Sequence, residues 1–265
     1  MSISLISRSS DPHQRQIPSF TARFDSNTRG QPMFYATIPD RCPYLGDRDM
    51  VSMFADPHQP MDAATYGRLI RLGFRRSGEH VYRHQCRNCT ACVPMRVNTN
   101  DFAADRKQRR VHRINKDLSV QVRDAVYDPR HFKLYEAYVN HRHQGGGMDN
   151  PSSESYWAFI HSTWCKTLLV EFSLGDQLLC VAVIDELPGA LSAVYTFFDP
   201  EAERRSLGTY AILWQIAYAK KQQRPHLYLG YWNQETHKMA YKADFMPAHG
   251  LYDGIWKPLR DGRKL

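Results

Sequence analysis

The chain has 265 residues, of which 42% are hydrophobic and 23% are charged. This length is enough to bury a full hydrophobic core, and the composition excludes a disordered chain. No stretch approaches the roughly 18 consecutive apolar residues of a membrane span, and residues 1–16 lack the apolar segment of a signal peptide. We therefore expect a cytoplasmic protein with no membrane partner.

The charge is strongly basic, with a net value of +8 and a pI near 9.2. A basic balance favours a polyanionic partner, for which tRNA is the natural candidate in the cytosol. The alternative is a soluble basic protein that has no such partner. The six cysteines of a protein in a reducing compartment favour ligand or reactive roles over disulfides.

Residues 1–105 are expected to form a loop-rich N-terminal domain that contains four of the six cysteines. One clear helix begins after Asp62, a residue type that caps helix starts, and stops at Gly73. A hairpin is expected next, over 74–82.

Residues 106–265 are expected to form a second domain. It opens with a basic run, either a linker or a surface helix, that we expect to contact tRNA phosphates: Arg106, Lys107, Arg109, Arg110, Arg113 and Lys116. Hydrophobic spacing then predicts a strand over 118–122, helices over 130–143 and from 153, strands over 167–174, 177–187 and 190–198, a helix over 206–222, a strand over 226–230, a helix over 233–243 and a strand over 250–256. Three glycines at 145–147 predict a flexible turn between the first two helices.

The order βααβββαβαβ resembles that of acyl-CoA N-acyltransferases of the GNAT type. The resemblance implies an α+β fold, in which a GNAT-like acyltransferase domain follows an N-terminal Cys-containing domain. It also implies a mixed sheet that splays open between its fourth and fifth strands. Fold analogy alone does not settle the acyl donor.

Four cysteines form the sharpest local pattern: Cys42, Cys86, Cys89 and Cys92. Gaps of two residues let successive thiolates converge on one ion, so the four sulfurs could hold zinc or an iron-sulfur cluster. The alternative is a set of simply buried thiols. Cys165 and Cys180 fall on apolar elements and are expected to pack in the core.

A second pattern lies between a strand and an apolar helix, at Arg205-Ser206-Leu207-Gly208-Thr209-Tyr210. In acetyltransferases a similar Arg and Gly spacing lets backbone amides at the helix start hold a pyrophosphate. Tyr210 replaces the small residue expected there and would crowd a pyrophosphate, which argues against coenzyme A. The alternative is an ordinary helix start capped by Ser206.

A third pattern is an apolar strand that ends in Gly230-Tyr231-Trp232, with Tyr228 before it. At a sheet opening, such a strand offers a close-approach glycine and aromatic walls. Lys238 and Lys242 follow, four residues apart on one helix face. Together they could present positive charge to a carboxylate, whereas the alternative is a solvated basic face.

Several segments resemble the arginyl-tRNA-protein transferase family, and most closely its bacterial, leucyl-transferring branch. They span nearly the whole chain: 42–45 (Cys-Pro-Tyr-Leu) with Asp47-Arg48, 73–78 (Gly-Phe-Arg-Arg-Ser-Gly), 86–96 (Cys-Arg-Asn-Cys-Thr-Ala-Cys-Val-Pro-Met-Arg), 192–200, 205–210, 228–232 and 238–242.

The resemblance implies an enzyme that moves Leu from leucyl-tRNA to proteins beginning with Asp or Glu and so marks them for N-degron (N-end rule) proteolysis. Eukaryotic relatives transfer Arg and have been associated with an iron-sulfur cluster. Their second N-terminal cysteine is replaced here by Leu45, so cluster binding is not carried over whole. Because the aminoacyl ester is already activated, the chemistry requires no cofactor.

Candidate catalytic residues, for holding or deprotonating the acceptor amine, are Tyr195, Asp199, Tyr231 and His237. Candidate substrate-binding residues are Arg48, Arg96, Arg205, Ser206, Gly208, Tyr210, Tyr228, Trp232, Lys238, Tyr241 and Lys242. Among them Lys242 is the first choice for the acidic side chain of the acceptor. Two other functions stay open: an acetyl-CoA-dependent N-acetyltransferase, and a non-catalytic, metal-stabilised RNA-binding module.

Overall fold

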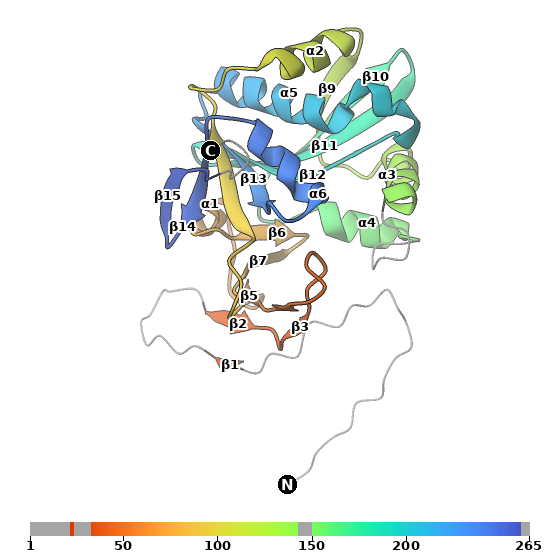
Figure 1. Cartoon of the computed structure of the whole chain (residues 1–265). Helices are drawn as coiled ribbons and strands as arrows, with labels where there is room; N and C mark the ends of the chain where they lie inside the picture. Colours follow the sequence, from red (N-terminus) through yellow and green to blue (C-terminus); the bar gives the residue numbers. More distant parts are fainter. Residues whose placement is uncertain (1–21, 24–32, 143–149, 261–265) are drawn as a thin grey trace.

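A computed structural model describes residues 22–23, 33–142 and 150–260 (Figure 1). Its centre is an eight-stranded mixed sheet, so the coarse prediction of a chain that mixes α and β structure is confirmed. The strand order across this sheet is β15 (Ile255–Pro258), β14 (Ala248–Tyr252), β8 (Val93–Asn98), β13 (His226–Trp232), β12 (Ala190–Phe198), β11 (Gln177–Leu187), β10 (Thr167–Leu174) and β9 (Ser119–Asp124). The predicted glycine turn at 145–147 lies outside the described residues.

Helices cover both faces of this sheet (Figure 1). On one face lie α2 (Arg106–Ile114) and α5 (Leu207–Lys221), and on the other lie α1 (Ala63–Arg71), α3 (Pro129–Arg142) and α4 (Ser153–Ile160). None of the described helices is both long and apolar enough to cross a bilayer.

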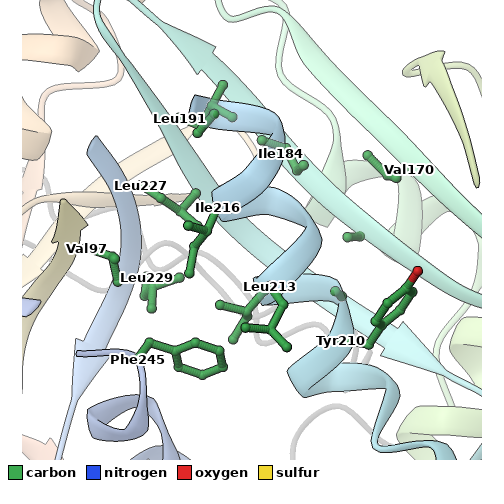
Figure 2. Close-up of a cluster of buried hydrophobic side chains, with 14 of the residues drawn as sticks. Val97, Val170, Ile184, Leu191, Tyr210, Leu213, Ile216, Leu227, Leu229 and Phe245 are labelled. Carbon is green, nitrogen blue, oxygen red and sulfur yellow. The ribbon is translucent and has the colours of Figure 1, made fainter. Parts of the chain in front are cut away.

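Side-chain alternation along the strands builds two separate cores. Val170 and Ile184 pack toward α5 in the cluster drawn in Figure 2, whereas the neighbouring Leu169 and Val183 pack toward α3 and α4. Because successive residues of a strand point to opposite faces, a sheet covered on both sides needs such continuous apolar runs.

The N-terminal part adds a five-stranded antiparallel sheet in the order β1 (Ala22–Arg23), β2 (Phe34–Ala36), β5 (Ser52–Ala55), β7 (His80–His84) and β6 (Arg75–Ser77). A two-stranded ribbon joins β3 (Asp40–Arg41) to β4 (Asp49–Met50). The predicted hairpin is confirmed as β6 and β7, and Asp62 caps α1 by accepting the Thr65 amide at 2.6 Å. Strand β8 lies before residue 105 in the sequence but belongs to the large sheet. The predicted domain boundary at 105 stays a prediction.

The sheet opens between β12 and β13, as the strand order led us to expect. These two strands are parallel and pair only from Ala190 with His226 to Ser192 with Tyr228. Beyond that point β12 carries a bulge at Val194, where its register with β11 shifts. On the other strand Gly230 adopts φ +71° inside a register shift with β8. Both irregularities re-aim side chains into the opening.

Two elements differ from the prediction. The helix expected over 233–243 is a single short turn, α6 (His237–Ala240), followed by a 3-10 turn (Tyr241–Asp244). The strand expected over 250–256 is instead the hairpin β14–β15. Its turn residues Asp253 and Gly254 both have positive φ, the conformation that tight two-residue hairpins require.

Candidate active site

A small cavity of about 10 Å³ lies where β12 and β13 separate. Ser192, Ala193 and Val194 line it from β12, and Tyr228 and Gly230 line it from β13. Its outer wall comes from α1, β6 and β8, so the N-terminal part of the chain closes one side of the sheet opening. The space accommodates about one water-sized group.

Two cations meet at Gly230. The Arg75 guanidinium carbon lies 5.8 Å from the ring centroids of both Tyr82 and Tyr231. A Cβ atom on Gly230 would lie 3.3 Å from Arg75 Nη1 and 3.9 Å from Lys242 Nζ. The positive φ and this close approach explain why the position is glycine.

Lys242 supports the irregular part of β13. Its Nζ donates to the carbonyl oxygens of Leu229 and Tyr231, both at 2.8 Å. Burial, followed by the charge of Arg75, lowers the pKa of Lys242 to about 7. Lys242 was predicted to bind the acceptor carboxylate. The structure places it at the opening, where two of its N–H donors are already bonded to backbone carbonyls.

Tyr195 lies just past the bulge in β12, among the aromatic rings of Tyr138 and Phe159. Its hydroxyl is buried and meets no hydrogen-bond partner among the described residues. Burial raises the pKa of Tyr195, while the charges of Arg142 and Arg75 act in the opposite sense. The group therefore stays protonated and has a donor to offer a ligand.

A larger hollow of about 350 Å³ lies between α3 and the start of α5. Its lining residues include Tyr138, His141, Arg142, Phe198, Ser206, Leu207, Gly208 and Tyr241. Ser206 precedes α5 in a left-handed conformation, with φ +51°, and its side chain makes no capping bond. The first amides of α5 are therefore available to an oxygen of a ligand.

Arg205 and Tyr210 do not face this hollow. Arg205 is bound to the Asp117 carboxylate at 2.9 Å. Tyr210 is only 7% exposed and packs in the core beneath α5, with Phe172 and His112 (Figure 2). The expectation that Tyr210 would crowd a bound pyrophosphate is thus wrong, because its ring points into the sheet.

Of the other catalytic candidates, Asp199 starts the 3-10 turn after β12, where it accepts the Glu201 amide at 2.9 Å. The Tyr231 hydroxyl donates to the Gly73 carbonyl at 3.0 Å and accepts from the His84 amide at 3.1 Å. Both side chains therefore have structural partners. The side chain of His237 lies outside the described part of the structure.

The remaining binding candidates are dispersed. Arg48 pairs with Glu235 at 2.9 Å, and Arg96 stacks over Trp256 at 4.4 Å. Trp232 is buried, and Lys238 lies on the exposed side of α6. Tyr228 and Tyr241 line the cavity and the hollow, respectively.

The four predicted metal ligands gather near one another, since Cys42, Cys86 and Cys89 all contribute to a raised pKa of Cys92, after the larger effect of burial. Among the described residues, however, three potential ligand atoms come within 4.8 Å of one another only at Asp128, His131 and Glu171. The cysteine sulfurs thus form no ready coordination sphere, and a metal or cluster there stays a prediction.

Arg75 belongs to this site and was not among the residues predicted from the sequence. It stands inside the family-like segment 73–78, but two adjacent arginines give no sign of which one faces the opening. Strand alternation places one on each face of β6, and the packing of β6 against β12 brings Arg75 to the opening.

Comparison with known proteins gives the relationship. The model of the arginine-tRNA-protein transferase N terminus matches residues 40–110, and that of the C terminus matches residues 130–252. An aspartate/glutamate leucyltransferase of Nitrosococcus oceani is 48% identical over 86% of this chain and 96% of its own. One of Marinobacter nauticus is 46% identical, with the same shares covered. A crystal structure of FemX aligns with 67% of this chain and 63% of that chain at 9% identity and a TM-score of 0.43. The chain belongs to the arginine-tRNA-protein transferase family.

Proposed function

We propose that this protein transfers leucine from leucyl-tRNA to the N-terminal Asp or Glu of proteins, in the cytoplasm, and thereby marks them for N-end rule proteolysis. Relatives named aspartate/glutamate leucyltransferase share 46 to 48% of their residues with nearly their full length aligned. The observation that carries the proposal in this chain is the opening between β12 and β13, which has cations on one side and a hollow at a helix start on the other. The same opening supports a GNAT-like fold.

The hollow beside α5 suits the donor. Its volume of about 350 Å³ is in the usual range for a small-molecule site. Arg142 supplies positive charge for a terminal phosphate, while Tyr138 and Phe198 offer apolar surface for the leucine side chain. In this position the ester carbonyl lies toward the uncapped amides of α5.

The chemistry needs alignment more than proton transfer. The acceptor amine nitrogen attacks the ester carbonyl, a C–N bond forms, the C–O bond to the terminal ribose breaks, and the ribose oxygen leaves with a proton. Orientation alone can supply about 7 to 11 kcal/mol of the barrier. An α-amino group with a pKa of about 7.7 to 8.0 is partly neutral before any base acts. Tyr195 and the amides of Leu207 and Gly208 are the donors for the developing oxyanion.

One assay tests this function against its rivals. Purified protein is mixed with labelled leucyl-tRNA, arginyl-tRNA or acetyl-CoA and with peptides that begin with Asp, Glu or Ala. We expect label from leucyl-tRNA on the Asp and Glu peptides. Faster acetyl transfer would identify an N-acetyltransferase, and tRNA binding without any transfer would identify an RNA-binding module.

The helix α2 is the proposed contact with the tRNA backbone. It holds Arg109 and Arg113, which line a hollow of about 650 Å³ with Lys116 beyond the helix and Lys220 of α5. Phosphate contacts release counterions, so each one adds about 0.7 to 0.9 to the slope of log affinity against log salt.

We expect Arg113→Gln to flatten this slope by about one contact while leaving acceptor recognition unchanged. Arg110→Gln, on the same helix but away from the hollow, is the matched control and should leave the slope as it is. Equal effects of the two substitutions would mean that the whole helix, and not this groove, attracts RNA.

A further inference from the structure

Arg75 is a partly buried cation without a counterion. Among the described residues it has no hydrogen bond and no ion pair, and its contacts are the rings of Tyr82 and Tyr231. The buried carboxylate of this region, Asp185, is held by the adjacent Arg76 at 2.6 Å. No described residue accepts a hydrogen bond from the half-buried Arg75 guanidinium, so its five N–H donors are available to a ligand.

A second cation makes the arrangement less favourable still. The Lys242 ammonium also lies near this glycine, and burial, followed by the charge of Arg75, lowers its pKa. Placing two cations together away from water costs free energy unless an anion accompanies them. The described residues supply no such anion at this point, so we expect a ligand to provide it.

Other polar atoms around Arg75 also lack partners. The hydroxyl of Tyr195 is unsatisfied, and the hydroxyl of Tyr66 lies in the cavity wall near Ser192 without a hydrogen bond of good geometry. The Nε2 atom of His84 is buried and unpaired as well. Buried polar groups in native proteins are normally satisfied, so several orphans in one place indicate a ligand site.

We propose that Arg75 binds the side-chain carboxylate of the acceptor's N-terminal Asp or Glu, with Lys242 beside it as a positioning residue. This inference rests on the proposed function. It replaces Lys242, which the sequence made the first choice for this carboxylate, with a residue that the sequence did not single out. Lys242 donates two hydrogen bonds to carbonyl oxygens of β13, and its pKa of about 7 leaves it partly neutral at neutral pH. The Arg75 guanidinium stays charged, and no described residue accepts from its donors.

The size and place of the cavity fit this role. Its volume of about 10 Å³ admits a carboxylate oxygen in place of a water, but not a whole residue. A carboxylate held there leaves the α-amino group outside the cavity. Residues that end in an amide would place an N–H group against the guanidinium, which disfavours Asn and Gln.

The test is the acceptor specificity of Arg75→Met at saturating leucyl-tRNA. Loss of a desolvated charge pair costs about 2 to 5 kcal/mol. At about 1.4 kcal/mol per tenfold change, this corresponds to a drop of about thirtyfold or more in kcat/KM for Asp and Glu peptides. The ratio of Asp to Asn transfer should fall toward one, while the KM for leucyl-tRNA stays unchanged.

Two further variants keep the result interpretable. Arg83→Met removes another guanidinium of the small sheet, which lies over the ring of Phe74 at 5.2 Å, and should keep the wild-type preference. Arg75→Lys preserves the charge and should restore part of the Asp preference.

The outcomes separate this inference from the proposed function. If the wild-type protein transfers leucine to Asp peptides and Arg75→Met retains their advantage over Asn peptides, this inference is wrong and the function stands. An equal loss for Asp and Asn peptides would place Arg75 at the reacting ester, and would also overturn it. If the wild-type protein transfers no leucine, the proposed function itself fails.

Discussion

Two adjacent arginines on β6, Arg75 and Arg76, differ in the partners that the fold gives them. Arg76 is 1% exposed and saturated with partners: it binds both oxygens of Asp185 at 2.6 Å, the Ile160 carbonyl at 2.9 Å and Thr167 at 3.1 Å. Arg75 points to the other face, where it lies over the rings of Tyr82 and Tyr231 and has no ion pair among the described residues. Arg76 ties the N-terminal part to the large sheet, and Arg75 is the residue that we propose binds a ligand. The two arginines are distinguished by whether the protein supplies hydrogen-bond acceptors for the guanidinium, and not by burial alone.

The largest effect is expected for Arg76→Met, which leaves the Asp185 carboxylate buried and unpaired. Breaking such a pair typically costs about 3 to 5 kcal/mol of stability. Urea unfolding of the purified variant measures it. Adding Asp185→Leu should recover part of the loss, because both charges are then gone. A loss below about 1 kcal/mol would mean that Arg76 is as dispensable to the fold as its neighbour.

A smaller effect is expected for Gly230→Ala. The left-handed conformation costs a residue with a Cβ roughly 1 to 2 kcal/mol, and the new methyl would stand 3.3 Å from Arg75 Nη1. We expect lower stability together with a higher KM for Asp peptides. Gly254→Ala is the matched control, since Gly254 has φ +75° with open space around it. It should lose similar stability and keep its KM; a raised KM there would trace the effect to strain alone.

The smallest change in stability is expected for Arg75→Met. The lost cation–π contacts, worth about 0.5 to 1 kcal/mol each, are offset by removal of an uncompensated charge. Thermal unfolding should place the variant within about 1 kcal/mol of the wild type. A loss as large as that of Arg76→Met would show that Arg75 holds the fold together, and the contrast between the two would vanish.

The sequence was most informative where its signals are local. Strands 167–174, 177–187 and 190–198 end where the structure ends them, because apolar runs bounded by glycine turns mark them directly. The Asp253-Gly254 turn carries an equally local signal, because Asp-Gly is typical of tight two-residue hairpins. Tyr195 was identified as a candidate from its segment, whereas its unsatisfied hydroxyl is visible only in three dimensions.

Features that depend on residues far apart in the sequence could not be predicted. Arg76 differs from Arg75 because it binds Asp185, which is 109 positions away in the chain. The small strands near the N-terminus are two to five residues long, too short for a periodic pattern. The function as a whole came from the family resemblance and not from these local features.

The position of β8 bears on how the chain is made. This strand precedes residue 105, yet its two neighbours in the sheet are β13 and β14, which come more than a hundred residues later. A ribosome therefore releases β8 long before either strand that pairs with it exists. Contacts so far apart in sequence slow folding and leave edges exposed in the meantime. Strand β8 must therefore wait for β13 and β14, and a chain truncated before β13 cannot assemble the opening at which the two cations meet.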